Sequence, residues 1–125
     1  MRVRELVGGN VIRVEPESTL RRAADEMVST GVGSAAVEVD GALEGILTER
    51  DILRAVHEDA DLDLDPVSAW MTEYPDSFTP ETDVAEAANW MLATGHRHLP
   101  VVDSGVVMGV ISIKDVLWAI TDPLD

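Results

Sequence analysis

Apolar residues in the first half of the chain occur first as a short β-branched run and then with the periodicity of a helix. The β-branched run Val11–Val14 predicts a short strand. Between Leu20 and Val28, apolar residues recur at helical spacing, with charged residues on the other side. This pattern predicts an amphipathic helix that begins at Ser18 or Thr19 and ends at Gly31.

Two further apolar runs, at 35–39 and 42–47, flank Asp40-Gly41. Glycine tolerates a positive φ, so this dipeptide predicts a tight hairpin between two antiparallel strands. Thr48 then begins a second helix, whose apolar positions are Ile52, Leu53 and Val56. The predicted order of elements is strand, helix, strand, strand, helix.

The same pattern returns after 64 residues, the spacing from Asp51 to Asp115, without a gap. In the second copy we expect a strand at 77–79, a helix at 83–94, strands at 99–102 and 106–111, and a helix from Ser112 onward. A duplicated sequence predicts a duplicated structure. The predicted fold class is α/β (α+β), with two βαββα repeats at 1–58 and 67–125 and an acidic linker at 59–66.

Composition restricts the class of protein. The chain is 46% hydrophobic, which argues against disorder, and its apolar runs are shorter than the ~20 residues of a membrane span. No secretory stretch follows Met1, and there is no cysteine. We expect a cytoplasmic protein that does not bind membranes.

Charge is strongly unbalanced, with 24 acidic residues, 9 basic residues and a net charge of −15. This argues against nucleic-acid binding. A large excess of carboxylates keeps a protein soluble in concentrated salt, which screens their repulsion. Because Lys114 is the sole lysine, we expect a halophilic source, such as a halophilic archaeon, rather than an ordinary acidic protein.

The linker 59–66 alternates aspartate with other residues and faintly resembles a calcium-binding loop. Pro66 stands where such a loop needs glycine, and Thr72 stands where it needs a bidentate glutamate. We therefore favour a solvated connector.

Each repeat carries Gly-apolar-apolar-Thr/Ser-x-x-Asp at a predicted helix start. A helix N-terminus attracts phosphate, and the hydroxyl of Thr48 or Ser112 lies there. Asp51 and Asp115 can accept hydrogen bonds from a vicinal diol such as that of ribose. The same residues can also form a helix cap, which would explain both motifs without a ligand.

Several basic residues are further candidates for anion binding. Arg50 and Lys114 occupy matching positions in the first turn of their helices, and His96-Arg97-His98 is the densest basic cluster. They can bind phosphate, or they can simply reach solvent. A metal site at His-x-His is a weaker alternative because no third ligand is apparent.

Order, spacing and repetition of these elements, together with the segment Gly95–Asp103, resemble the paired cystathionine-β-synthase (CBS) domain module over essentially the whole chain. The resemblance implies two repeats that pack through their sheets with pseudo-twofold symmetry. It also implies two clefts between the repeats for an adenosyl ligand: AMP, ADP, ATP or S-adenosylmethionine. No cofactor is expected to be required.

The resemblance assigns roles to the candidate residues. Ribose hydroxyls would bind Asp51 and Asp115. Phosphate would bind Thr48, Ser112, Arg50, Lys114, His96, Arg97 and His98. The base pocket would be formed by Val11, Ile12, Asp76, Ser77, Phe78 and Pro100. The first repeat has Gly31-Val32-Gly33-Ser34 in place of the basic segment, so we expect unequal clefts, one of them empty or bound to an uncharged adenosyl group.

The tryptophans Trp70, Trp90 and Trp118 fit either a subunit interface or ordinary core packing. In the family, helices at the ends of the module form a dimer, so we expect a homodimer.

These features favour a regulatory module that binds an adenosyl ligand and signals its occupancy to an unknown effector protein. An enzyme is disfavoured because the chain has no cysteine nucleophile, no glycine-framed serine and no convincing metal cluster. The remaining alternative is a structural homodimerisation scaffold with vestigial clefts.

Overall fold

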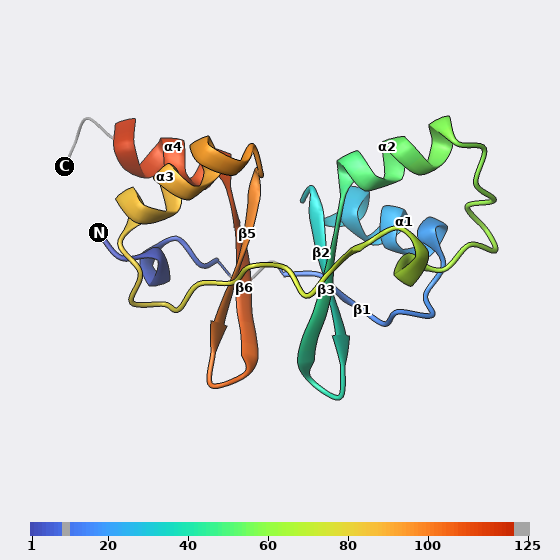
Figure 1. The fold of residues 1–125 in the computed structure, drawn as a ribbon, viewed down its shortest axis with the longest axis horizontal. Helices are drawn as coiled ribbons and strands as arrows, with labels where there is room; N and C mark the ends of the chain where they lie inside the picture. Colours follow the sequence, from blue (N-terminus) through green and yellow to red (C-terminus); the bar gives the residue numbers. More distant parts are fainter. Residues whose placement is uncertain (9–10, 122–125) are drawn as a thin grey trace. The chain divides into compact units, whose positions relative to one another are not determined.

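The computed structural model describes residues 1–8 and 11–121, which form two compact units (Figure 1). One unit contains residues 11–75, and the other combines residues 1–8 with residues 76–121. The predicted end of the second repeat, at residues 122–125, lies outside the described residues.

The unit of residues 11–75 is a small sheet with two helices on one side (Figure 1). The sheet order is β1-β2-β3-β4, in which β1 is parallel to β2 and the other pairs are antiparallel. Its elements are β1 (Arg13–Val14), α1 (Leu20–Thr30), β2 (Ser34–Val39), β3 (Ala42–Thr48), α2 (Glu49–His57), a 3₁₀ turn (Val67–Ala69) and β4 (Thr72–Glu73).

Local sequence explains the bounds of these elements. The side chain of Thr19 accepts a hydrogen bond from the Arg22 amide and caps α1, which ends at Gly31 with φ of 75°. Asp40 and Gly41 both have positive φ, as the predicted tight hairpin requires. The buried side of α1 and the inner sides of β2 and β3 then form one apolar core, whose members include Leu20, Ala23, Met27, Val37 and Leu47.

The second unit has the same helices and hairpin. Its elements are a 3₁₀ turn (Val3–Glu5), α3 (Val84–Thr94), β5 (His98–Asp103), β6 (Val106–Ser112) and α4 (Ile113–Thr121). Its core includes Val3, Met91, Leu99, Val101 and Ile111. None of the helices in the described ranges has the length and apolar character needed to span a membrane.

The predicted strand at 77–79 is the main error in the expected elements. Only Phe78 forms a bridge there, to Val101, which matches the pairing of Val14 with Val37 in the first repeat. In the first repeat the Ala36 amide also donates to the Ile12 carbonyl at 2.8 Å. Position 36 corresponds to Pro100, which has no N–H to donate. The second ladder is therefore shorter.

The N-terminal segment packs within the unit that contains the second repeat. Val3 is fully buried in that core, and its amide donates to the Thr82 carbonyl at 2.8 Å. Val67 makes the equivalent bond to the Ser18 carbonyl at 2.7 Å in the other unit. This role of Val3 was not predicted from the sequence, although Val3 and Val67 are separated by the repeat spacing of 64.

The acidic segment 59–66 is more ordered than a solvated connector. Its aspartates at 61 and 63 are exposed, but Leu62 packs against the core. The Arg21 amide donates to the Leu62 carbonyl at 2.8 Å, and the Leu20 amide donates to the Asp65 carbonyl at 3.1 Å. The segment is thereby tied to the first turn of α1.

The three tryptophans lie in different environments. Trp70 and Trp90 are partly buried and pack against the cores of their respective units. Trp118 on α4 is 59% exposed. Within each unit, core packing therefore accounts for two of the tryptophans, and Trp118 is the one presented at the surface.

Candidate functional site

The end of β6 and the start of α4 bring Ser112 and Asp115 together. The Asp115 Oδ2 accepts hydrogen bonds from the Ser112 amide at 2.8 Å and from the Ser112 hydroxyl at 3.1 Å. In return, the Ser112 Oγ accepts one from the Asp115 amide at 3.2 Å. This is the reciprocal pattern of a capping box, so the capping interpretation of the motif is correct for the second repeat.

Thr48 and Asp51 form the same box at the start of α2. The Asp51 Oδ2 accepts from the Thr48 amide at 2.8 Å and from its hydroxyl at 3.1 Å. The two repeats differ at the other carboxylate oxygen. The Asp51 Oδ1 accepts from Arg54 at 3.4 Å, whereas the Asp115 Oδ1 has no hydrogen-bond partner among residues 1–8 and 11–121. A cap and a diol-binding carboxylate are therefore compatible at Asp115, because one oxygen is left to accept.

The neighbours of Ser112 lie on the side of the hairpin away from the helices. His98 is directly opposite Ser112 in the β5–β6 register, and Pro100 is opposite Val110. Leu99, between them, belongs to the core under the helices. Because side chains alternate along a strand, His98, Pro100 and Ser112 share the opposite face, which we call the distal face of the hairpin.

A second group of predicted residues gathers around Trp90 on α3. The Trp90 Nε1 donates to Asp76 at 3.3 Å, and Phe78 contacts the indole edge to face at 5.7 Å between centroids. His96 stacks on the indole at 5.2 Å with an interplanar angle of 14°. The structure thus brings together Asp76, Phe78 and His96 through a residue that the sequence analysis had considered only for interface or core packing. The sequence did contain a signal for Trp90: the corresponding position in α1 is Glu26, so the tryptophan is particular to the second repeat.

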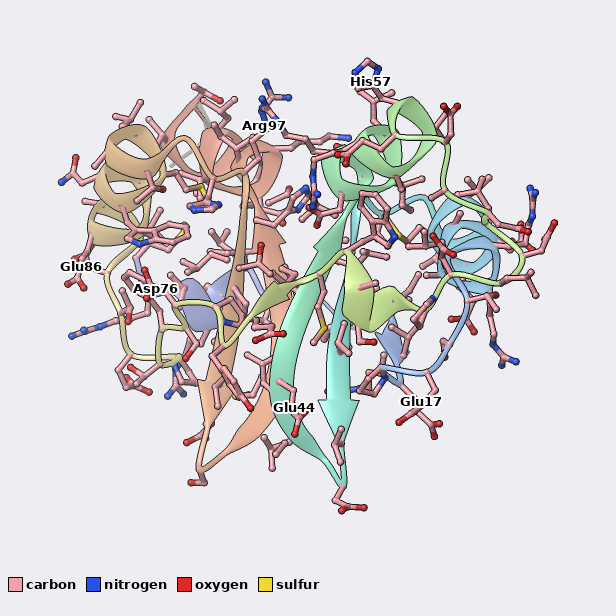
Figure 2. The ribbon with its side chains drawn as sticks, turned by 45° about the vertical axis from the view of Figure 1, so that its right-hand side comes forward. Glu17, Glu44, His57, Asp76, Glu86 and Arg97 are labelled. Atoms are coloured by element: carbon pink, nitrogen blue, oxygen red, sulfur yellow. The ribbon has the colours of Figure 1, made fainter. Side chains whose placement is uncertain are left out.

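The basic residues of the second repeat lie near the start of α4. The Arg97 carbonyl accepts from the Ile113 amide at 2.8 Å, which fixes the segment before β5 beside the first turn of that helix. Lys114 lies in the same turn. Both side chains are exposed, and within the described ranges neither forms an ion pair. Figure 2 shows that Arg97 lies well away from Asp76 in this unit.

The predicted residues of the second repeat therefore fall into two groups. Ser112, Asp115, His98 and Pro100 lie on the distal face or at its end, with Arg97 and Lys114 nearby. Asp76, Phe78 and His96 surround Trp90. The Phe78 amide joins the groups by donating to the Pro100 carbonyl at 3.0 Å. Ser77 is exposed between Asp76 and Phe78.

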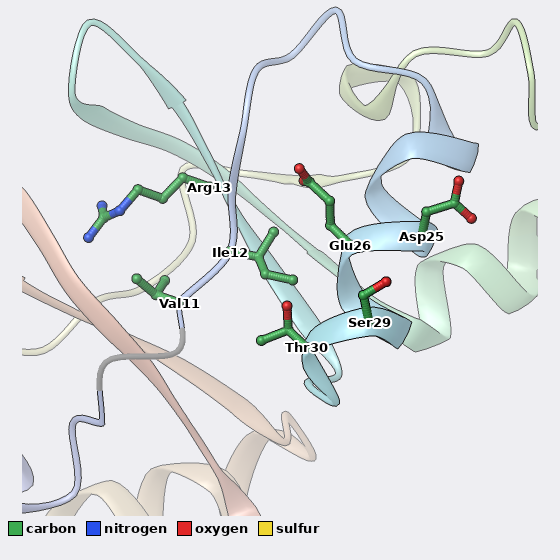
Figure 3. Close-up of a pocket in the computed structure, with 7 residues that line it drawn as sticks. All are labelled: Val11, Ile12, Arg13, Asp25, Glu26, Ser29 and Thr30. Atoms are coloured by element: carbon green, nitrogen blue, oxygen red, sulfur yellow. The ribbon is translucent and has the colours of Figure 1, made fainter.

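In the first repeat, Val11 and Ile12 line a pocket of about 370 Å³ (Figure 3). The other lining residues are Arg13 on β1 and Asp25, Glu26, Ser29 and Thr30 on α1. Thr48 and Asp51 do not line it. Arg50 is exposed in the first turn of α2, without an ion pair in the described part of the chain. The lining of this pocket thus includes the two predicted base-pocket residues and none of the predicted ribose and phosphate residues of this repeat.

Metal coordination finds no support in the described residues. No group of three or more histidine, aspartate or glutamate side chains there is placed to hold an ion. His96 stacks on Trp90, and His98 is half-buried on β5.

Comparison with known proteins finds relatives that match nearly the whole length of this chain. A 17.7 kDa protein of Acidianus ambivalens is 37% identical over 97% of this chain and 74% of its own length. A CBS domain-containing protein of Bacillus subtilis is 32% identical over 90% of this chain and 81% of its own.

Solved structures also match nearly the whole chain. A CBS domain protein from Pyrobaculum aerophilum, in complex with AMP, is 31% identical with a TM-score of 0.85 and covers 92% of this chain and 89% of its own. A CBS-domain protein from Agrobacterium tumefaciens is 31% identical with a TM-score of 0.86, over 95% and 98% of the two chains. The CBS domain family matches residues 3–58 and again residues 67–122. The chain belongs to the CBS domain family and consists of a tandem pair of CBS domains.

Proposed function

We propose that this CBS pair is a regulatory module that binds an adenosyl ligand and passes its occupancy to a partner protein. The observation that carries the proposal is the carboxylate of Asp115, which is held in place through Oδ2 while Oδ1 is left to accept hydrogen bonds. The relative from Pyrobaculum aerophilum, 31% identical, was solved in complex with AMP, which supports an adenine nucleotide as the ligand class.

In this proposal the second repeat forms the stronger site. Asp115 accepts from the ribose hydroxyls, and Ser112 at the N-terminus of α4 binds phosphate. Arg97 and Lys114 add positive charge, which favours a phosphorylated ligand in a chain of net charge −15. His98 and Pro100 share the distal face with Ser112 and are candidates for further phosphate and base contacts.

The remaining predicted roles stay proposals with less support. Asp76, Ser77 and Phe78 are candidates for the base, and His96 for phosphate, but three of these four surround Trp90 instead of Ser112. In the first repeat, Asp51, Thr48 and Arg50 are the matching ribose and phosphate candidates, and Val11 and Ile12 the base candidates. We also keep the division of the sequence into repeats at 1–58 and 67–125 with a linker at 59–66.

No catalytic step is part of this proposal. Turnover of ATP by the pure protein would favour an enzyme instead. The second rival, a homodimerisation scaffold without ligand binding, predicts that a change at Asp115 alters stability and nothing else.

The test is thermal unfolding in molar KCl with AMP, ADP, ATP or S-adenosylmethionine. A ligand at a hundred times its dissociation constant adds about 2.7 kcal/mol to the stability. We expect D115A to lose this increment. D83A is the matched control, because Asp83 caps α3 in the same unit and carries the same charge. Without ligand, each variant should lose about 1 kcal/mol of unfolding free energy, because each substitution removes a helix cap. No increment with any ligand, or an increment that D115A retains, would contradict the proposal.

We further propose that the protein forms a homodimer through α2 and α4. Leu53 is 69% exposed on α2, and its counterpart Leu117 is 53% exposed on α4, next to Trp118. Both repeats thus present an apolar side chain at the same exposed position. Sedimentation analysis should give a dimer that L117E or L53E dissociates, and a monomeric wild type would contradict this.

We also propose that the protein functions at high salt. The repulsion among 24 acidic residues is screened as ionic strength rises. The melting temperature should therefore rise steeply when KCl is added to a low-salt solution. A melting temperature that does not change with KCl would contradict a halophilic source.

A further inference from the structure

The two ribose-binding candidates are not equally free. In Asp51 both carboxylate oxygens are engaged, because Thr48 occupies Oδ2 and the Arg54 Nη2 lies 3.4 Å from Oδ1. In Asp115 only Oδ2 is engaged, within the part of the chain that the structure describes. A vicinal diol needs acceptor positions on the carboxylate. A diol that binds Asp51 would have to displace the guanidinium of Arg54 from Oδ1.

Arg54 is held in position by more than this ion pair. Its Nη2 donates to the Trp70 carbonyl at 3.1 Å, and its guanidinium carbon lies 5.1 Å from the centre of the Trp70 ring. An Arg guanidinium over an indole face is an attractive cation–π arrangement. The side chain of Asp51 beneath it is only 15% exposed. Arg54 therefore covers Asp51 from a site that is anchored to the 3₁₀ segment.

The second repeat lacks this arrangement. Position 54 corresponds to Trp118, which is 59% exposed and makes no hydrogen bond to Asp115. The 3₁₀ position that matches Trp70 is Leu6, which has no aromatic ring to hold a cation. Both members of the Arg–Trp pair are thus replaced together in the repeat whose aspartate has one carboxylate oxygen without a hydrogen-bond partner in the described part of the chain.

The residues beside the two capping boxes also differ between the repeats. A Cβ built on Gly33 would lie 3.0 Å from the Glu49 carboxylate, so this acidic group lies over the segment before β2. The matching residues in the second repeat are Arg97 and Ile113. The second repeat therefore has an arginine at the position of Gly33 and no acidic residue at the position of Glu49, which favours a phosphorylated ligand there.

We infer that Arg54 is a specificity-determining residue that closes the ribose position of the first repeat, so that the chain binds one phosphorylated adenosyl ligand, at the second repeat. The inference rests on the proposed function and adds the reason for unequal sites. Removal of the guanidinium frees the Asp51 Oδ1, and a second ligand binds.

The experiment is equilibrium dialysis with AMP, which counts bound ligands per chain. The proteins are wild type, R54Q, R54M, D115A and the double variant R54Q/D115A. R21Q is the control: Arg21 is also a helix arginine paired with an aspartate, so its loss changes the charge equally. Loss of any positive charge makes the electrostatic potential of the whole protein more negative, and this weakens the binding of an anion such as AMP. A gain of binding in R54Q or R54M is therefore opposite to the nonspecific effect.

We expect one AMP per wild-type chain, a second and weaker AMP in R54Q and R54M, one in R21Q, none in D115A and one in R54Q/D115A. Two equivalent AMP molecules in the wild type would overturn this inference alone. So would a single AMP in both Arg54 variants, with thermal unfolding showing that at least one is folded. Absence of AMP from the wild type, or its retention in D115A, would overturn the proposed function and with it this inference.

Discussion

Val7 covers Gly109 in β6, since a Cβ built on this glycine would lie 2.8 Å from the Cγ1 of Val7. The repeat-related pair is Met71 over Gly45 in β3. The first residues of each repeat thus lie in the unit that contains most of the other repeat, and they pack on the glycine of its hairpin. The N-terminal segment is thereby a structural part of the unit that carries Ser112 and Asp115.

The packing of Val7 on Gly109 predicts a specific coupling between two substitutions. G109A places a methyl group against Val7, and overpacking of this kind costs about 1–3 kcal/mol. V7A makes room for that methyl group, so the double variant should be more stable than the sum of the two single effects predicts. Chemical denaturation of all four proteins measures this coupling. Strictly additive effects would show that the two residues do not pack together.

Val3 provides a second test of the same segment. It is fully buried, as is its counterpart Val67, so V3A and V67A should each lose about 2 kcal/mol of unfolding free energy. V28A is the control, because Val28 is exposed on α1. Chemical denaturation gives all three values. If V3A were as stable as V28A, the N-terminal segment would not belong to the core.

Much of this fold could be predicted from the sequence, because periodicity and turn residues specify local elements. The helices around Met27 and Met91, and the hairpin at Asp40-Gly41, follow from such local signals. The location of Val3 could not, since a segment of a few residues carries no periodicity and its partner is more than 70 residues away.

The candidate site was predictable to a similar degree. The spacing Ser-x-x-Asp specifies the contact between Ser112 and Asp115, because one helical turn separates them. Spacing could not show that Trp90 would gather Asp76 and His96, because that contact depends on packing between segments. The difference between Asp51 and Asp115 likewise depends on Arg54, whose contact needs three-dimensional coordinates.

Pro100 predicts a change that can be measured at one backbone position. P100A supplies the missing N–H where the first repeat has the bond from the Ala36 amide to the Ile12 carbonyl. We expect the new amide at position 100 to donate to the Asp76 carbonyl, and we expect both this amide and the Ala36 amide to exchange slowly. Hydrogen exchange followed by NMR measures both. Rapid exchange at position 100 beside a protected Ala36 would show that proline is not the reason for the shorter ladder.

The pair of Arg21 and Asp63 predicts a pH dependence. The guanidinium donates to the carboxylate at 2.9 Å and lowers the pKa of Asp63. Its stabilising effect is therefore present above the ordinary carboxyl pKa of about 3.9 and is lost as the pH falls through the lowered value. R21Q should raise the pKa of Asp63 toward its ordinary value in an NMR titration at low salt. An unchanged pKa would show that the pair does not form in solution.

An NMR titration of the carboxyl-labelled protein with AMP tests whether Asp115 and Ser112 bind the ligand. We predict that the Asp115 carboxyl and the Ser112 amide shift first, in proportion to occupancy, and that the Asp51 carboxyl stays unchanged at the same concentrations. The D83A control should behave like the wild type, and D115A should show no saturable shifts. Saturable shifts elsewhere that leave Asp115 and Ser112 unaffected would contradict the claim that this cap is the ribose and phosphate site.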